Sequence, residues 1–138
     1  MKRNFLLFTA ALAMAVTTAA SAQTIKVKVN VPFGFIVNRA TLPAGEYLVQ
    51  SVDDEGKVLA IRDLDTNTTS LVAFNSCMSL KSASQTKLIF HRYGERYFLN
   101  QIWVEGNSIG HELRPNRREK EVAKDFSVRE VVLTAARR

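Results

Sequence analysis

Beyond the first 22 residues, apolar and polar residues alternate in short runs that are separated by turn sequences. In the first run, Ile25, Val27 and Val29 occupy every second position, so they share one buried face of a predicted strand. Further short runs with strand character follow at 33–37, 46–52, 57–62 and 70–74. The sequence Leu42-Pro43-Ala44-Gly45 suits a type I turn. This rhythm of strands and turns is typical of an all-β domain.

The clearest element is a hairpin predicted over 87–104, with Gly94 and Glu95 as a two-residue type II′ turn. This turn fixes which residues of the two strands face each other. One face then carries the pairs Arg92/Tyr97, Phe90/Leu99 and Leu88/Gln101, and the other carries Tyr93/Arg96, His91/Phe98 and Ile89/Asn100. The pairing also places the Arg92 guanidinium over the Tyr97 ring, a cation–π contact worth about 0.5–1 kcal/mol.

One helix is predicted, over 117–125. Asn116 suits its N-cap, and Glu119 stands where its side chain bonds back to the cap in a capping box. Arg117 and Glu121 are spaced to form an i,i+4 ion pair, and Val122 and Phe126 form an apolar stripe. The Val-rich segment 128–135 follows as a final strand, and its composition favours a place inside the sheet.

These elements predict an all-β fold with one domain over 23–138. We expect an antiparallel β-sandwich or a small barrel of about seven to nine strands, with one short helix before the last strand. A chain of 138 residues leaves room for one such domain and not for two.

The first 22 residues have the pattern of a secretory signal peptide. Lys2 and Arg3 precede an apolar core of about a dozen residues, and Ala20-Ser21-Ala22 supplies a small-residue cleavage pattern. We therefore expect an exported protein, periplasmic or extracellular, whose mature chain starts at Gln23 and does not span a membrane.

The single cysteine and the net charge limit the bonds and the binding partners that can be expected. Cys77 is the only cysteine, so no intrachain disulfide can form; a buried small hydrophobe is the favoured role, ahead of an intermolecular disulfide or a reactive thiol. The chain carries a formal charge of +6, and the basic excess lies in its C-terminal part, which permits attraction to anionic partners. Nucleic acid is not expected, because export removes the protein from most of it.

Several short sequence motifs occur in order along the chain: Val31-Pro32-Phe33, Leu42-Pro43-Ala44-Gly45-Glu46-Tyr47, Phe90-His91-Arg92-Tyr93-Gly94, Tyr97-Phe98-Leu99, Glu112-Leu113 and Arg117-Arg118-Glu119. With these motifs and the signal peptide, the chain resembles a group of small uncharacterised exported bacterial proteins. The resemblance covers essentially the whole chain after the leader. The resemblance implies a bacterial, exported protein. It implies no activity and no functional residue, because these motifs belong to turns, to the core and to a hairpin.

Catalytic patterns are weak. The only imidazoles are His91 and His111, and a metal site would need them together with Glu105 or Glu112. A Cys77–His91 dyad is the other arrangement that the residue types allow, but the sequence has no Gly-x-Ser-x-Gly elbow and no phosphate-binding glycine loop. We therefore expect no catalytic residue, no cofactor and no resident metal.

Three functions remain. The leading hypothesis is a non-catalytic module of the cell envelope or the secretome that is structural or binds another macromolecule, at residues that the sequence does not identify. The alternative is a carrier of a small apolar ligand, whose barrel cavity would be lined by Phe33, Phe35, Phe90, Leu99 and Trp103. The third is a hydrolase or metal-dependent enzyme that uses His91 and His111.

Overall fold

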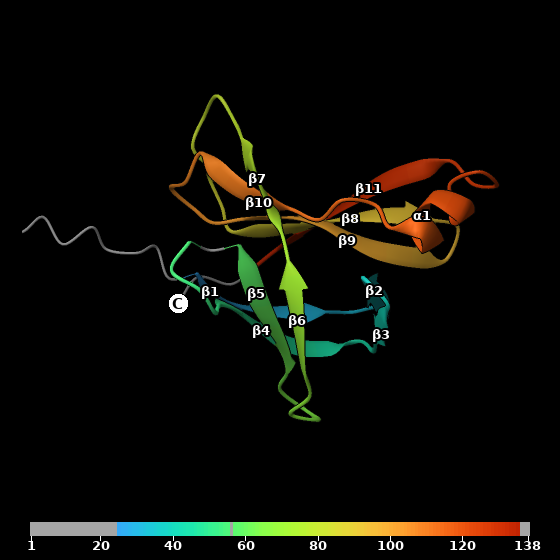
Figure 1. Cartoon of the computed structure of the whole chain (residues 1–138), viewed down its shortest axis with the longest axis horizontal. Coiled ribbons are helices and arrows are strands. Elements are labelled where there is room, and N and C mark those ends of the chain that lie inside the picture. The colour runs from blue at the N-terminus through green and yellow to red at the C-terminus, as the bar shows by residue number, and fades with distance from the viewer. Residues whose placement is uncertain (1–24, 56, 136–138) are drawn as a thin grey trace, which may run out of the picture.

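The computed structural model describes residues 25–55 and 57–135. Within these residues the chain forms eleven strands and one short helix (Figure 1). In chain order they are β1 (Lys26–Val31), β2 (Phe35–Val37), β3 (Ala40–Leu42), β4 (Gly45–Ser51), β5 (Val58–Asp63), β6 (Thr69–Ala73), β7 (Asn75–Met78), β8 (Lys87–Tyr93), β9 (Arg96–Trp103), β10 (Ile109–Glu112), α1 (Arg117–Val122) and β11 (Val128–Thr134).

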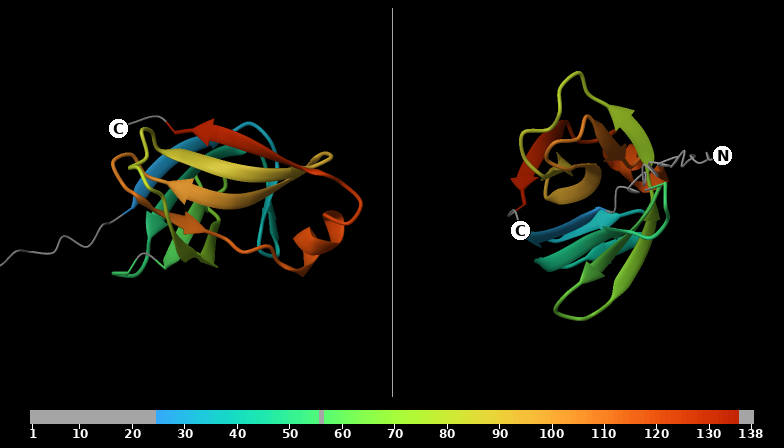
Figure 2. Two further views of the ribbon diagram at one scale, coloured as in Figure 1. Left: turned by 90° about the horizontal axis from the view of Figure 1, so that it is seen from above. Right: turned by 90° about the vertical axis from the view of Figure 1, so that its left-hand side faces the viewer.

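The strands form two sheets that face each other (Figure 2). The first sheet has the order β1-β4-β5-β6, and its neighbouring strands are antiparallel. The second sheet has the order β11-β8-β9-β10-β7. The short strand β2 joins the second sheet through one parallel pairing, of Ile36 with Phe98, and β3 pairs with β2. The chain crosses between the sheets after β1, returns after β3, and crosses again at Phe74, between β6 and β7.

The space between the sheets is filled by apolar side chains from both of them. Alternate residues of β1 point inward, and Val27, Val29 and Val31 are each at most 5% exposed. Phe90 and Leu99 meet them from the second sheet and belong to the same core cluster. The period-2 pattern that predicts β1 therefore has its physical cause in this core.

The predicted fold class is confirmed: the described chain consists mostly of strands, with a short helix before the last one. The two sheets form a sandwich, and the described strands do not close into a barrel. The structure has eleven strands rather than about seven to nine because it adds β3, β7 and β10, which have three or four residues each. Runs of that length are too short to show a period in the sequence.

The prediction that the last strand lies inside a sheet is wrong. β11 pairs with β8 and forms one edge of the second sheet. Val128 and Val132 are about half exposed, at 53% and 47%. β-Branched residues favour extended backbone at an edge as well as at the centre of a sheet, so composition does not assign the position.

The predicted hairpin is confirmed from its turn as far as Phe90. Gly94 has a φ of 61°, as the first central position of a type II′ turn requires. Beyond Phe90 the predicted pairing is wrong, because Ile89 faces Gln101 and not Asn100. Asn100 is an extra residue in β9, so it forms a β-bulge that shifts the register by one.

The signal peptide predicted over 1–22 lies outside the described residues. In the part of the chain that the structure describes, no helix has the length and apolar character needed to cross a membrane.

Candidate functional site

The helix α1 begins where the sequence predicts. The side-chain Oδ1 of Asn116 accepts a hydrogen bond from the backbone N–H of Glu119 at 2.9 Å, as an N-cap does. The predicted end at Asp125 is three residues too far, because α1 ends at Val122. After that residue, the N–H groups of Asp125 and Phe126 bond back to the carbonyl of Val122 in a turn.

One side of α1 is buried against the second sheet. Val122 joins Ile36, Tyr93 and Phe98 in a small apolar cluster, which is separate from the core between the sheets. The opposite side of the helix is exposed and carries charged residues. The predicted ion pair between Arg117 and Glu121 is not among the ion pairs of the described residues.

The segment that leads into α1 is held at two points. The buried Asn100 of the β9 bulge accepts a hydrogen bond from the Leu113 N–H at 2.7 Å through its backbone carbonyl. Its side-chain Nδ2 donates to the Leu113 carbonyl at 3.5 Å. Three residues later, the Nδ2 of Asn116 donates to the carbonyl of Asn38, in the turn between β2 and β3. The start of α1 is thus fixed to the sheet and to a turn 78 residues away in sequence.

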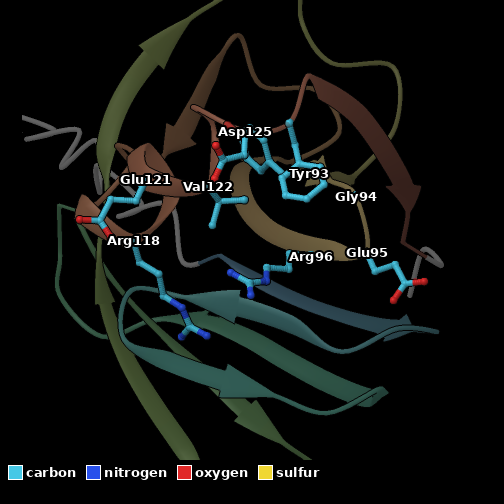
Figure 3. Close-up of a pocket in the computed structure, with 9 residues that line it drawn as sticks. Tyr93, Gly94, Glu95, Arg96, Arg118, Glu121, Val122 and Asp125 are labelled. Atoms are coloured by element: carbon cyan, nitrogen blue, oxygen red, sulfur yellow. The ribbon is translucent and has the colours of Figure 1, made fainter.

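A groove of about 600 Å³ lies between α1 and the tip of the β8–β9 hairpin (Figure 3). The buried Tyr93 and Val122 lie between its charged walls. Figure 3 shows the side chains of Arg96 and Arg118, from β9 and α1, extending toward the same side of this groove. The carboxylate of Glu95 points away from both guanidinium groups.

Two further grooves continue the first one. A groove of about 920 Å³ lies between the β2–β3 turn, β6 and the start of α1, and shares Arg118 and Glu121 with the first. A groove of about 280 Å³ lies beside β11 and shares Gly94 and Phe126 with the first. We call the three together the arginine groove. The arginines that line it are Arg39, Arg92, Arg96, Arg117, Arg118 and Arg129.

No guanidinium group of the arginine groove forms an ion pair with a carboxylate of the described residues. Across residues 25–55 and 57–135, the ion pairs join Lys28 to Glu46 at 4.0 Å and Lys57 to Glu55 at 2.8 Å, and neither pair lines the groove. All six groove arginines except Arg92 are exposed. Their positive charge is therefore presented to solvent or to a ligand.

Arg92 is held differently from the other five. Its Nε donates to the Gly94 carbonyl at 2.7 Å, and its guanidinium lies 5.4 Å from the centre of the Tyr97 ring. The cation–π contact predicted from the hairpin pairing is confirmed. Because this side chain is already oriented, it provides a fixed charge at the β11 end of the arginine groove.

The groove also contains acidic and apolar groups. Three carboxylates line it, those of Glu95, Glu121 and Asp125. Phe126 is 52% exposed in the groove, and Leu71 is 63% exposed at its β6 end. The surface therefore combines cations, hydrogen-bond acceptors and apolar patches.

Glu119 lies beneath this surface. It is 4% exposed, and its Oε2 has no hydrogen-bond partner among the described residues. The capping-box bond that the sequence predicts from this side chain to Asn116 is not formed among them either. Burial raises the pKa of the Glu119 carboxyl above its usual range. Burial, and then the nearby Glu119 charge, raise the pKa of Tyr93 as well.

The residues predicted for a metal or catalytic site are not brought together. His91 faces Phe98, which belongs to the cluster under α1, whereas His111 faces Ile102, which belongs to the core between the sheets. The register therefore places the two imidazoles on opposite faces of the second sheet. No group of three His, Cys, Asp or Glu residues in the described ranges is placed to hold a metal ion.

Cys77 lies in β7 opposite Gly110, and it is half-buried rather than fully buried. Burial is the main cause that raises the pKa of its thiol, and the charge of Glu112 adds to this. A raised pKa leaves less thiolate at neutral pH, so the thiol is less reactive than a free cysteine. A dyad with His91 is not formed, because the two residues lie on strands that β10 and β9 separate.

The residues predicted to line an apolar cavity are mostly packed against one another. Phe35, Phe90 and Leu99 belong to the core between the sheets and are at most 2% exposed. Phe33 stacks on the Tyr97 ring with a centroid distance of 3.8 Å. Trp103 instead borders a shallow groove of about 330 Å³ on another part of the surface, where its Nε1 donates to Gln101.

The sequence alone does not identify the arginine groove. The one signal that pointed toward it is the basic excess after residue 87, where five of its six arginines lie. Arg39 comes from a turn that is distant in sequence, which the hydrogen bond between Asn116 and Asn38 holds beside the start of α1.

The fold and this site define an all-β sandwich with a charged groove beside its single described helix. Comparisons of the chain with known protein families, with curated proteins and with solved structures find no match.

Proposed function

We propose that the protein is an exported, non-catalytic module that binds an extended anionic ligand in the arginine groove. The observation that carries this proposal is the set of six arginines that line three adjoining grooves and form no ion pair with a described carboxylate. Its extended shape suits a polymer better than a small molecule. Export comes from the signal-peptide pattern, and the resemblance to small exported bacterial proteins agrees with it.

Arginine is well suited to this role. The guanidinium group is planar, stays charged at every physiological pH, and donates two parallel hydrogen bonds to a carboxylate or a phosphate. Several such groups along one groove raise the local concentration of an anionic ligand. The binding is therefore expected to weaken as salt is added, because the charges are exposed and screened.

The proposal assigns no bond-making or bond-breaking step to the protein. It is supported by the distribution of the reactive side chains: His91 and His111 face opposite sides of a sheet, and Cys77 lies on an edge strand away from both the groove and His91.

The first prediction concerns the groove arginines. The purified protein is titrated with polygalacturonate and, separately, with inorganic polyphosphate, and binding is followed by calorimetry. We expect at least one of these polyanions to bind, and the triple substitution Arg39→Ala, Arg117→Ala and Arg118→Ala to weaken binding about tenfold or more. A tenfold loss of affinity corresponds to about 1.4 kcal/mol of binding free energy. Three charge-assisted hydrogen bonds can contribute at least this much.

The matched control removes the same charge elsewhere. Lys26, Lys28 and Arg62 lie on the first sheet and do not line the arginine groove. The triple alanine variant at these positions is expected to bind nearly as tightly as the wild type. Equal weakening in both variants would show that net charge alone drives binding, and it would refute the assignment of the groove.

A further inference from the structure

We infer that the ligand of the arginine groove is an acidic polysaccharide whose charge is carried by uronic-acid carboxylates. This inference rests on the proposed function and names the ligand class. It is carried by the other groups in the groove, which a ligand must also satisfy: three carboxylates, exposed apolar surface and neutral polar side chains.

The carboxylates favour a ligand of moderate charge density. Glu121 lies where two of the three grooves meet, and Glu95 and Asp125 line the first one. A polymer with a phosphate at every unit would bring its negative charges close to these groups and be repelled. A uronic-acid polymer carries one carboxylate on each ring and also several hydroxyl groups. Those hydroxyls can donate hydrogen bonds to Glu95, Glu121 and Asp125, while the uronate groups meet the arginines.

The apolar surface favours sugar rings. The ring of Phe126 lies against Gly94, whose lack of a side chain leaves room for it, and about half of Phe126 stays exposed. At the other end of the groove, Leu71 of β6 is exposed beside the buried Val72. The C–H face of a pyranose ring is apolar and packs on such surfaces, so burying it against Phe126 gains free energy that a phosphate chain cannot supply.

Neutral polar groups complete the second groove. Asn38 and Ser70 line it together with Arg39 and Arg117. Amide and hydroxyl side chains both donate and accept hydrogen bonds, as sugar hydroxyls do. The three grooves together therefore carry cations for carboxylates, polar groups for hydroxyls and apolar surface for ring faces.

The test compares three probes at equal concentration of negative charge and equal salt: polygalacturonate, inorganic polyphosphate and single-stranded DNA. Neutral dextran serves as a fourth, uncharged sugar probe. We expect polygalacturonate to bind the protein at least tenfold more tightly than each of the other three. The substitution Phe126→Ala is expected to weaken polygalacturonate binding about fivefold or more and to leave the weak binding of polyphosphate unchanged within twofold.

Phe126 packs on the hairpin turn, so the thermal unfolding of the Phe126→Ala variant is recorded first. If that variant does not fold, Leu71→Ser at the exposed β6 position replaces it and carries the same expectation. Tighter or equal binding of polyphosphate or DNA overturns this inference while the proposed function stands. Absence of binding by all three polyanions overturns both. Equal binding of dextran overturns the role of the carboxylates.

Discussion

Glu119 shows how one buried group can act against the stability of the fold. Its carboxyl is nearly inaccessible to solvent, and one oxygen has no hydrogen-bond partner among the described residues. Taking a charged carboxylate out of water is unfavourable, and this is the cause of its raised pKa. The sequence predicts the helix start from the spacing of Asn116 and Glu119, but it does not show which way the second side chain turns.

The second prediction follows from that pKa. A carboxyl whose pKa is higher in the folded state than in the unfolded state binds its proton more tightly when folded. Its contribution to the free energy of unfolding therefore falls as the pH rises from the ordinary value of 4.5 through the folded-state pKa. Glu119→Gln, which removes the charge, is expected to stabilise the protein at pH 7 by roughly 0.5–2 kcal/mol.

The measurement is thermal unfolding of both proteins between pH 4 and pH 8. The gain in Tm of the variant over the wild type is expected to grow with pH and to disappear toward pH 4, where the carboxyl is protonated in both states. Glu121→Gln, on the exposed side of the same helix, is the control and should show no such pH-dependent gain. A gain that stays constant over this range would contradict the assigned cause.

At the scale of single elements, α1 depends on contacts at its start more than on its own length. A helix of six residues is not stable by itself in water. Asn116 both caps it and bonds to the carbonyl of Asn38, so one side chain fixes the helix and the neighbouring turn. The two sides of the groove of about 920 Å³ are thereby held in place relative to each other.

The third prediction separates these two tasks. Asn116→Ala removes the cap and the bond to Asn38 and is expected to lower the free energy of unfolding by about 1–2 kcal/mol. Asn116→Ser keeps a capping oxygen but is too short to reach Asn38, so it should recover a part of that loss. Urea unfolding of the three proteins provides the values. Equal stability of the serine variant and the wild type would show that the bond to Asn38 contributes nothing.

The elements differ in how far the sequence could predict them. The hairpin turn and the N-cap of α1 depend on local chemistry, the φ of Gly94 and the side chain of Asn116, so both were predictable. The bulge at Asn100 was not, because its buried amide is matched to the carbonyl of Leu113, which reaches it only after folding. The edge position of β11 was likewise a property of the whole sheet and not of its residues.

At the scale of the whole molecule, the sandwich is stabilised by apolar packing between two sheets. The core cluster draws on both sheets and includes fully buried residues such as Phe90, Leu59 and Ile102. Burial of this kind contributes roughly 1.5–3 kcal/mol for each large side chain. The chain has a single cysteine, so no disulfide within it adds to this.

The fourth prediction is that the stability of the fold depends on neither a metal ion nor a disulfide. The thermal unfolding transition of the purified protein is expected to keep its midpoint when EDTA or dithiothreitol is added, because the core requires neither a metal nor a disulfide. Scanning calorimetry in the presence and absence of each reagent measures this. A loss of the transition with EDTA would reveal a structural metal and would make His91 and His111 candidate metal ligands again. A fall with dithiothreitol would point to a bond between the Cys77 residues of two chains.

The arginine groove was the least predictable feature of the whole molecule. Its basic residues come from one turn, the two strands of the hairpin, the helix and the last strand, and no single segment carries a recognisable motif. Tertiary structure alone brings Arg39 and Arg118 to the same surface.

The bulge of β9 has a consequence for how this scaffold can change. The groove residues Arg39, Arg96, Arg117 and Arg118 are exposed, whereas Asn100, whose hydrogen bonds to Leu113 hold the segment before α1, is buried. Selection, or a library of variants, can therefore exchange the exposed arginines one at a time while the hydrogen bonds between Asn100 and Leu113 keep the backbone in place. Substitutions of these side chains can therefore change which ligand the protein binds without changing how it folds.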